Sequence, residues 1–484
     1  MRRFLPAFIL VIVAGLWVAK PVSAHANLIR SVPEAGAVLI QSPPEIILEF
    51  SEDLDLAVTR LELFDANGQA MNPGPGVIEP GLPRVLRLKI NALSDGVYSA
   101  VWRARSAVDG HITNGSVGFS IGEASPPASL LPPPGTPDPA TVFPSTAETI
   151  ARWLAYVATA VAVGSLCFGF LIWRPAYRRE LNKSAVSDEA IRKLIRRWAL
   201  GSLAGLGIVT LGFAIIQAAQ AAQVSVWSAL TISFTQLFSG RIGLLLGVRL
   251  ILIIIMGAFV LRLPSPGIGS SQAWWTILGL GSLLLLTFSL QGHGAARGSI
   301  IGVIVIWLHL AAMTVWLGGL PMLILALRQA DVPASVLVPR FSEAALVSVG
   351  IIVATGVYNA FAYVKTGEAL TATTYGRALL AKTGVFVLLY ALGTINLFYL
   401  SPRLQESNAT ARKGLIRTVR VEMALGIILL LAVGILSGVA PAYEALQVHQ
   451  EQGIIESASV DGVDILLRVV PGESGENEIG VEFT

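Results

Sequence analysis

Eight long apolar stretches follow one another in the second part of the chain and constrain its fold more than any other feature. They lie near 150–173, 198–222, 241–262, 273–291, 300–327, 342–364, 377–400 and 420–441. Each is long enough to cross a hydrocarbon layer about 30 Å thick at about 1.5 Å per residue. Only 13% of the residues are charged and 54% are hydrophobic, whereas a soluble domain is about one quarter charged. We therefore expect a membrane domain over 148–441, an all-α bundle of eight transmembrane helices.

The basic residues predict the orientation of this bundle. The two most basic loops, 174–198 and 401–420, follow the first and the seventh stretch, and basic loops stay in the cytoplasm. Residues 1–24 begin with two arginines, continue as a short apolar run and end in "VSA", which is typical of a signal peptide cleaved after Ala24. We expect a multi-pass protein of the cytoplasmic (inner) membrane, with both the N-terminal domain and the C-terminal tail outside the cytoplasm.

Residues 25–122 have the pattern of a small all-β domain. Short alternating runs, among them "EIILEF", "TRLELF", "RVLRLKI" and "VYSAVWRA", are separated by Pro, Gly, Asn and Asp. Period-two alternation with turns at this spacing predicts a sandwich or barrel. A proline-dense segment over 123–147 predicts an extended linker. The tail over 442–484 contains two further alternating runs around "PGESGEN" and is expected to be β-rich, as a short or incomplete domain.

Two stretches of the membrane domain resemble each other, which favours a parallel four-plus-four repeat. "WLAYVATAVAVGSL" (153–166) aligns without gaps with "WLHLAAMTVWLGGL" (307–320), and a Gly-Arg pair precedes the third and the seventh stretch. Internal repeats of this kind are common in transporters. Chance similarity between apolar segments is the alternative explanation.

The expected β domain contains only two histidines, and these suggest a metal site. His25 would become the first residue after cleavage and would supply an amine as well as an imidazole. Asp109 and His111 flank Gly110, so on an extended segment they project to the same face. An amine, two imidazoles and a carboxylate suit tetragonal Cu(II) better than tetrahedral Zn(II). A turn at Asp-Gly-His with no metal is the structural alternative.

The same segments resemble a known family. "HANLIRSVPEAGAVLIQSPPEIILEFSEDL" and "WRARSAVDGHITNGSVGFSI" are similar to the CopC family of periplasmic copper-binding proteins, over about 25–122. The resemblance implies a Cu(II) site at His25, Asp109 and His111, with Glu52 as a further carboxylate near the metal. The Met-rich Cu(I) loop of some members is missing here. Residues 148–441 resemble the CopD family of inner-membrane proteins in "WLHLAAMTVWLGGL", "YGRALLAKTGVFVLLYALGTINL" and "RTVRVEMALGIILLLAVGILSGVAP".

Three residues of the bundle suggest a copper path. His293 lies at the outer end of the fourth stretch, His309 lies within the fifth, and Met313 follows His309 by one helical turn. This order of ligands becomes softer with depth and would suit Cu(I). Interhelical hydrogen bonding by His309 and gap filling by Met313 are the alternatives. Arg249 and Lys382 also lie inside predicted spans, where they either bond to backbone or line a cavity; for Lys382, snorkelling to the outer interface is the simpler interpretation.

These features predict a copper protein that is not an enzyme. No P-loop, aspartyl-phosphate segment or Ser/His/Asp set is recognisable, and Cys167 is the only cysteine. We expect copper binding outside the membrane and copper transport, in the inward direction, that contributes to copper homeostasis and resistance. The expected partners are copper ions and membrane lipids, with periplasmic copper chaperones or cuproenzymes as further candidates and no nucleic acid. One alternative is a copper-buffering or copper-delivery protein without transport; the other is a b-type haem protein that uses His293 and His309.

Overall fold

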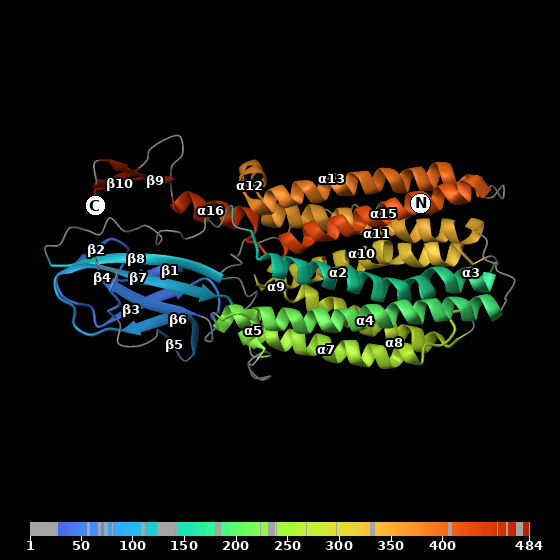
Figure 1. Ribbon diagram of the computed structural model, residues 1–484, viewed down its shortest axis with the longest axis horizontal. Helices are drawn as coiled ribbons and strands as arrows, with labels where there is room; N and C mark the ends of the chain where they lie inside the picture. The colour runs from blue at the N-terminus through green and yellow to red at the C-terminus, as the bar shows by residue number, and fades with distance from the viewer. Residues whose placement is uncertain are drawn as a thin grey trace.

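The protein consists of a β domain at one end of a long helical bundle (Figure 1). The computed structural model describes residues 28–484 apart from 56–58, 66–68, 72–75, 80, 108–111, 123–140, 142, 180–184, 223, 231–237, 239, 268, 297, 330–333, 405–408, 453, 461–462, 471–477 and 484. From residue 448 onward only the backbone is described. The expected signal peptide and most of the expected proline-dense linker lie outside the described residues.

The β domain is a sandwich of two four-stranded sheets. One sheet has the order β1-β3-β6-β5 and the other the order β2-β8-β7-β4. The eight strands are β1 (Leu28–Val32), β2 (Ala37–Leu39), β3 (Glu45–Phe50), β4 (Arg60–Asp65), β5 (Val77–Glu79), β6 (Leu82–Lys89), β7 (Gly96–Arg105) and β8 (Ile112–Ile121). All pairs are antiparallel except β2 with β8. The predicted all-β class is confirmed.

Alternation along the strands places one apolar face of each sheet in a common core. On β3, Ile46, Leu48 and Phe50 are buried while the residues between them are not. Phe50 meets Trp102 of the facing sheet edge to face, with ring centroids 5.0 Å apart. Gly115 of β8 lies directly beneath the Trp102 indole, where a Cβ atom would be 2.5 Å from the ring. These contacts keep the ends of β3 and β7 in fixed positions.

Among the described residues, eight helices are long and apolar enough to span a membrane, as predicted. Their bounds, with the short π-helical and helical segments that continue two of them, are Thr146–Arg178, Asp188–Gln220, Gly240–Leu261, Ser271–Ser289, Ile300–Leu327, Ala334–Tyr363, Thr374–Arg403 and Arg412–Leu436. The corresponding elements are α2 (Thr146–Cys167) with η1 (Phe168–Trp173) and α3 (Arg174–Arg179), α4 (Ala185–Ala222), α7 (Gly240–Leu261), α8 (Ser271–Ser289), α10 (Ile300–Leu327), α11 (Ala334–Tyr363), α13 (Thr374–Ile395) with η2 (Asn396–Leu400) and α14 (Ser401–Arg403), and α15 (Ala409–Leu436).

Short helices cover the end of the bundle that faces the β domain, which we call the β-domain end (Figure 1). They are α5 (Val226–Ala229), α9 (His293–Ala296) and α12 (Gly367–Ala372). The helix α16 (Ala442–Gln452) and the strands β9 (Ile454–Val460), β10 (Val463–Val470) and β11 (Glu478–Phe483) lie on the same side of the bundle as the β domain. The expected β-rich tail is confirmed, because β10 pairs antiparallel with both β9 and β11. The sequence pattern did not predict α16 or β9.

The helices α2 and α10, which carry the two similar stretches, pack directly against each other. A Cβ atom on Gly164 of α2 would lie 2.4 Å from the backbone of Thr314 and Gly318 on α10. Gly164 and Gly318 occupy the same position in the two aligned stretches. Small residues allow this close backbone approach, as in many membrane bundles. The four-plus-four repeat itself stays a prediction.

Candidate functional site

Glu52 is buried directly after β3, at the end of the sandwich. Its side chain is only 3% exposed. The Ser106 hydroxyl, directly after β7, donates a hydrogen bond of 2.5 Å to Glu52 Oε2. A buried carboxylate needs such donors or a positive charge, because removing it from water is costly. The structure therefore places Glu52 beside the end of β7.

Strand pairing brings three segments together at this end of the sandwich. The first residue of β1, Leu28, pairs with Phe50, two residues before Glu52. At the other side Ile112, the first residue of β8, pairs with Arg105. Backbone hydrogen bonds of 2.8 Å from Asp55 N to Arg105 O and from Ala107 N to Asp53 O join the segment after β3 to the end of β7.

His25, Asp109 and His111 lie outside the described residues. In the chain, His25 precedes Leu28 by three residues, and Asp109 and His111 belong to the short connection between β7 and β8. Their role as metal ligands stays a prediction. Glu52 is the one member of the predicted ligand set whose position the structure describes.

Arg105 connects this end of the β domain to the bundle. Its side chain is buried and donates from Nη2 to the Gln217 Oε1 atom of α4. Gln217 Nε2 donates in turn to Glu148 Oε1 of α2 over 2.5 Å. The guanidinium also lies 3.7 Å from the Asp55 carboxylate. Ser106, the partner of Glu52, is thus the neighbour in the chain of a residue that contacts the membrane domain directly.

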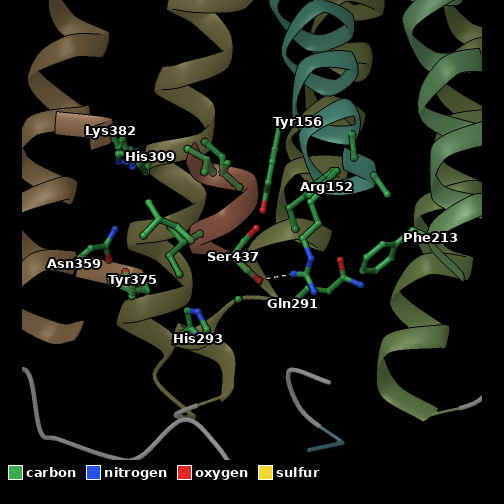
Figure 2. A pocket seen from close by; sticks show the side chains of 18 of the residues that line it. Arg152, Tyr156, Phe213, Gln291, His293, His309, Asn359, Tyr375, Lys382 and Ser437 are labelled. Carbon is green, nitrogen blue, oxygen red and sulfur yellow. Dashed lines mark hydrogen bonds between the residues drawn. The ribbon is translucent and has the colours of Figure 1, made fainter. Parts of the chain in front are cut away.

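A cavity of about 200 Å³ lies in the bundle next to this contact, and Gln217 is one of its lining residues. Residues from most of the spanning helices line it, near the β-domain end (Figure 2). The two histidines of the membrane domain that were singled out from the sequence, His293 and His309, line this cavity. Lys382 also lines the cavity, which is one of the two alternatives considered for it, and Figure 2 shows it beside His309.

Hydrogen bonding of His309 fixes which ring nitrogen carries the proton. His309 Nδ1 lies 2.8 Å from Thr355 Oγ1 on α11. The single Thr355 hydroxyl proton is directed to Ile351 O at 2.6 Å, so Thr355 accepts from His309 and Nδ1 is the donor. The neutral imidazole then keeps the lone pair of Nε2, which is the atom a metal would bind.

The other two residues of the predicted path occupy different environments. His293, on α9, is 8% exposed and lies edge-on to the rings of Tyr363 and Tyr375, with centroids 5.9 and 6.5 Å away. Met313 is 6% exposed and belongs to the apolar core of the bundle. It is not among the residues that line the cavity. The three do not form one continuous lining, and the path itself stays a prediction.

Several polar residues of the bundle were not singled out from the sequence. Arg152, Gln217, Gln291 and Asn359 line the cavity. Glu422 of α15 is 3% exposed and accepts a hydrogen bond of 2.6 Å from Asn396 Nδ2. The available signal was a polar residue within an apolar span, which is costly in lipid and is a functional candidate by default.

Three family comparisons cover most of the chain and agree with this arrangement. The CopC domain family matches residues 28–122, the N-terminal domain family of copper resistance protein D-like proteins matches 144–303, and the copper resistance protein D (CopD) family matches 335–436. One chain therefore contains segments that match the CopC and the CopD family models.

Among individual proteins, the copper transport protein CutJ of Bacillus subtilis (strain 168) is similar over nearly the full length. The two are 29% identical over 490 residues, which is 99% of this chain and 85% of CutJ. Protein YobA of Escherichia coli (strain K12) is 28% identical over 115 residues, covering 24% of this chain and 92% of YobA.

Solved structures of copper proteins are similar to the β domain. The crystal structure of CopC from Methylosinus trichosporium OB3b shares 27% identity and covers 20% of this chain and 93% of its own, with a TM-score of 0.19. PcoC, a methionine-rich copper resistance protein from Escherichia coli, shares 29% identity and covers 20% of this chain and 99% of its own, with a TM-score of 0.17.

Proposed function

We propose that this protein binds copper on the outer side of the cytoplasmic membrane and transports it inward through the membrane domain, in support of copper homeostasis and resistance. The CopC and CopD family matches support copper as the cargo. A relative named as a copper transport protein, similar over 99% of this chain, supports transport. The eight apolar helices support a multi-pass membrane location. The protein acts by binding and passing the ion, without a catalysed reaction.

The convergence of three segments beside Glu52 is the observation on which the metal site depends. A residue spans at most about 3.6 Å of extended chain, so His25 is within about 11 Å of Leu28, which starts β1 at this end of the sandwich. Asp109 and His111 follow Ser106, the hydrogen-bond partner of Glu52. We assign Cu(II) to His25, through its amine and imidazole, and to Asp109 and His111. Glu52 orients the site or completes its charge.

The contact between Arg105 and Gln217 suggests where copper would pass from the β domain to the membrane domain. It joins the residue next to Ser106 to a side chain that lines the cavity. Copper released from the β domain would enter the cavity and meet His293 and His309 there, and Nε2 of His309 would bind the metal. Met313, in the apolar core one turn beyond His309, would hold Cu(I) at the next step.

Transport can be tested with isotopically labelled copper and proteoliposomes that contain the full-length protein. We expect uptake by the wild type and at least a tenfold loss in His309→Ala. Equal flux in both, or no flux in either, contradicts transport through the cavity. In the second case, tight Cu(II) binding by the same preparation would identify a buffering or delivery protein.

The terminal amine can be tested separately by Cu(II) electron paramagnetic resonance on protein whose N-terminus has been sequenced. A short tag left in front of His25 removes the amine from the site and should weaken Cu(II) binding at least tenfold. The same tag placed after Thr484 is the control. Unchanged binding with the N-terminal tag would contradict the role of the amine.

The charge of the cavity lining favours the alternative of a copper-buffering or copper-delivery protein without transport. The charged side chains that line the cavity in the described part of the chain are the cations Arg152, Arg249 and Lys382. Such a lining repels a bare copper ion. The haem alternative is less well supported, since a cavity of about 200 Å³ is small beside pockets for drug-sized ligands. Absence of a Soret band in purified protein would exclude haem.

A further inference from the structure

The cavity in the membrane domain has an unusual charge. Three of its lining residues are cationic, namely Arg152 of α2, Arg249 of α7 and Lys382 of α13. None of its described lining residues is an aspartate or glutamate. His293 and His309 add imidazoles to this lining but no negative charge. The charged groups of the described lining are therefore all cations, and the Glu148 carboxylate lies behind Gln217, one hydrogen bond outside this lining.

These cations lie well inside the membrane-spanning helices. Arg152 follows the first residue of α2 by six positions, Arg249 that of α7 by nine, and Lys382 that of α13 by eight. At about 1.5 Å per residue they lie roughly 9 to 14 Å from the helix ends. A charge at this depth is costly unless a partner of opposite charge compensates it.

The partners that the structure gives Arg249 are neutral. Its side chain is 3% exposed, donates to Thr287 Oγ1 at 2.9 Å and to Gln291 Oε1 at 2.5 Å, and lies 3.6 Å from the centroid of the Phe288 ring. A hydroxyl, an amide oxygen and an aromatic face provide hydrogen-bond acceptors and a ring contact for the guanidinium, but none of them carries a negative charge that would neutralise it.

Arg152 has the same kind of surroundings. It donates from Nη1 to the Ser437 carbonyl oxygen and lies 5.1 Å from the Phe213 ring centroid. Its Nε atom is buried and has no hydrogen-bond partner among the described residues. Arg152 and Arg249 line the same cavity. Figure 2 shows Arg152 and Gln291 extending toward the same space.

Two glutamine amides at this end of the cavity use their oxygen atoms to accept from arginines, so N–H groups remain as donors. Gln291 uses Oε1 to accept from Arg249, which leaves its NH₂ group for the cavity. At Gln217, Oε1 accepts from Arg105 while Nε2 donates to Glu148 with one of its two protons. Two guanidinium forks and an amide NH₂ are the donors that carboxylates and phosphates accept from most effectively.

We propose that this cavity is a binding site for a small oxyanion, a carboxylate or phosphate group, held by Arg152, Arg249 and the Gln291 amide, with Lys382 adding charge from the opposite wall. A volume of about 200 Å³ admits a group of a few heavy atoms. The anion supplies the opposite charge that the described lining lacks. It would also lower the repulsion of a copper ion near His309, but the anion site does not depend on copper.

Binding can be measured with the full-length protein in a maltoside detergent, free of phosphate and copper and with a chelator present. Labelled inorganic phosphate is the probe, and unlabelled acetate competes as the carboxylate. We expect saturable phosphate binding that acetate displaces and that Arg152→Gln and Lys382→Gln each weaken at least tenfold. The matched control is Arg377→Gln, because Arg377 is an exposed cation on α13 that does not line the cavity.

A second arm distinguishes the two sources of the oxyanion. If added phosphatidylglycerol displaces labelled phosphate at low molar ratio, the occupant is a lipid headgroup; if it does not, the occupant is a free anion. Lack of saturable phosphate binding overturns the proposal. So does unchanged affinity in both cavity variants, each folded as judged by a melting temperature close to that of Arg377→Gln. Because copper is absent, these outcomes are independent of whether the protein transports copper.

Discussion

Gly164 and Gly318 bring the backbones of α2 and α10 into direct contact. A methyl group on Gly318 would lie 1.9 Å from the Ala160 carbonyl oxygen, and one on Gly164 would lie 2.4 Å from the Thr314 carbonyl oxygen. No side chain rotation relieves such overlaps, because backbone atoms form both sides of the contact. The two helices that carry the similar stretches therefore depend on glycine at the position where they meet.

We predict that Gly318→Ala destabilises the bundle by about 1–3 kcal/mol, the usual effect of an overpacked core. Thermal unfolding in detergent measures the change. Gly384→Ala is the matched control, since Gly384 lies in a spanning helix with no neighbouring atom within 4 Å of its Cβ position. Equal melting temperatures of the two variants would contradict the close contact.

Glu52→Gln should lower the Cu(II) affinity of the β domain about tenfold while the fold is retained, because residues that support metal ligands commonly contribute this much. Glutamine keeps an oxygen that accepts from Ser106 but removes the charge. Isothermal titration with Cu(II) gives the affinity. The control is Glu49→Gln, which removes an exposed carboxylate from β3; equal losses in both variants would indicate a general effect of charge.

Thr355→Val should reduce copper uptake roughly 10–100-fold, the typical cost of losing a group that orients a metal-binding histidine. Without the hydroxyl, the His309 Nδ1 proton loses its acceptor and the ring loses its fixed tautomer. Labelled copper flux into proteoliposomes is the readout. Thr383→Val is the control, because Thr383 is exposed on α13 and donates to its own helix at Leu379 O. Wild-type flux in Thr355→Val would argue against His309 as a ligand.

Glu422→Ala should destabilise the protein by about 1–3 kcal/mol, because buried polar groups lose a partner. Asn396 donates to Glu422 and accepts from Thr418 over 2.5 Å, so the three form one chain of hydrogen bonds between η2 and α15. Glu422→Gln keeps an acceptor for Asn396 and removes a charge from the membrane interior, and is expected to be as stable as the wild type or more so. The order of the melting temperatures checks this, and a less stable Glu422→Gln would show that the charge itself is needed.

The sequence by itself determined the eight spans and the class of the β domain, because hydropathy and period-two alternation are local properties of the chain. The runs that it predicted as strands correspond to β3, β4, β6 and β7. It also supplied the motif residues His25, Asp109 and His111, whose roles remain predictions. Spacing alone can place residues on one segment, but it does not say which segments meet.

Only the tertiary structure decided what lies next to what. Glu52 meets Ser106 because β3 and β7, which belong to different sheets, both terminate at the same end of the sandwich. Arg152, Arg249 and Lys382 come from three helices far apart in sequence and share one cavity. An isolated cation in an apolar run looks like an interfacial residue, since its depth and its neighbours follow from helix packing. The charge of the cavity is therefore a property of the folded bundle that no single stretch of sequence contains.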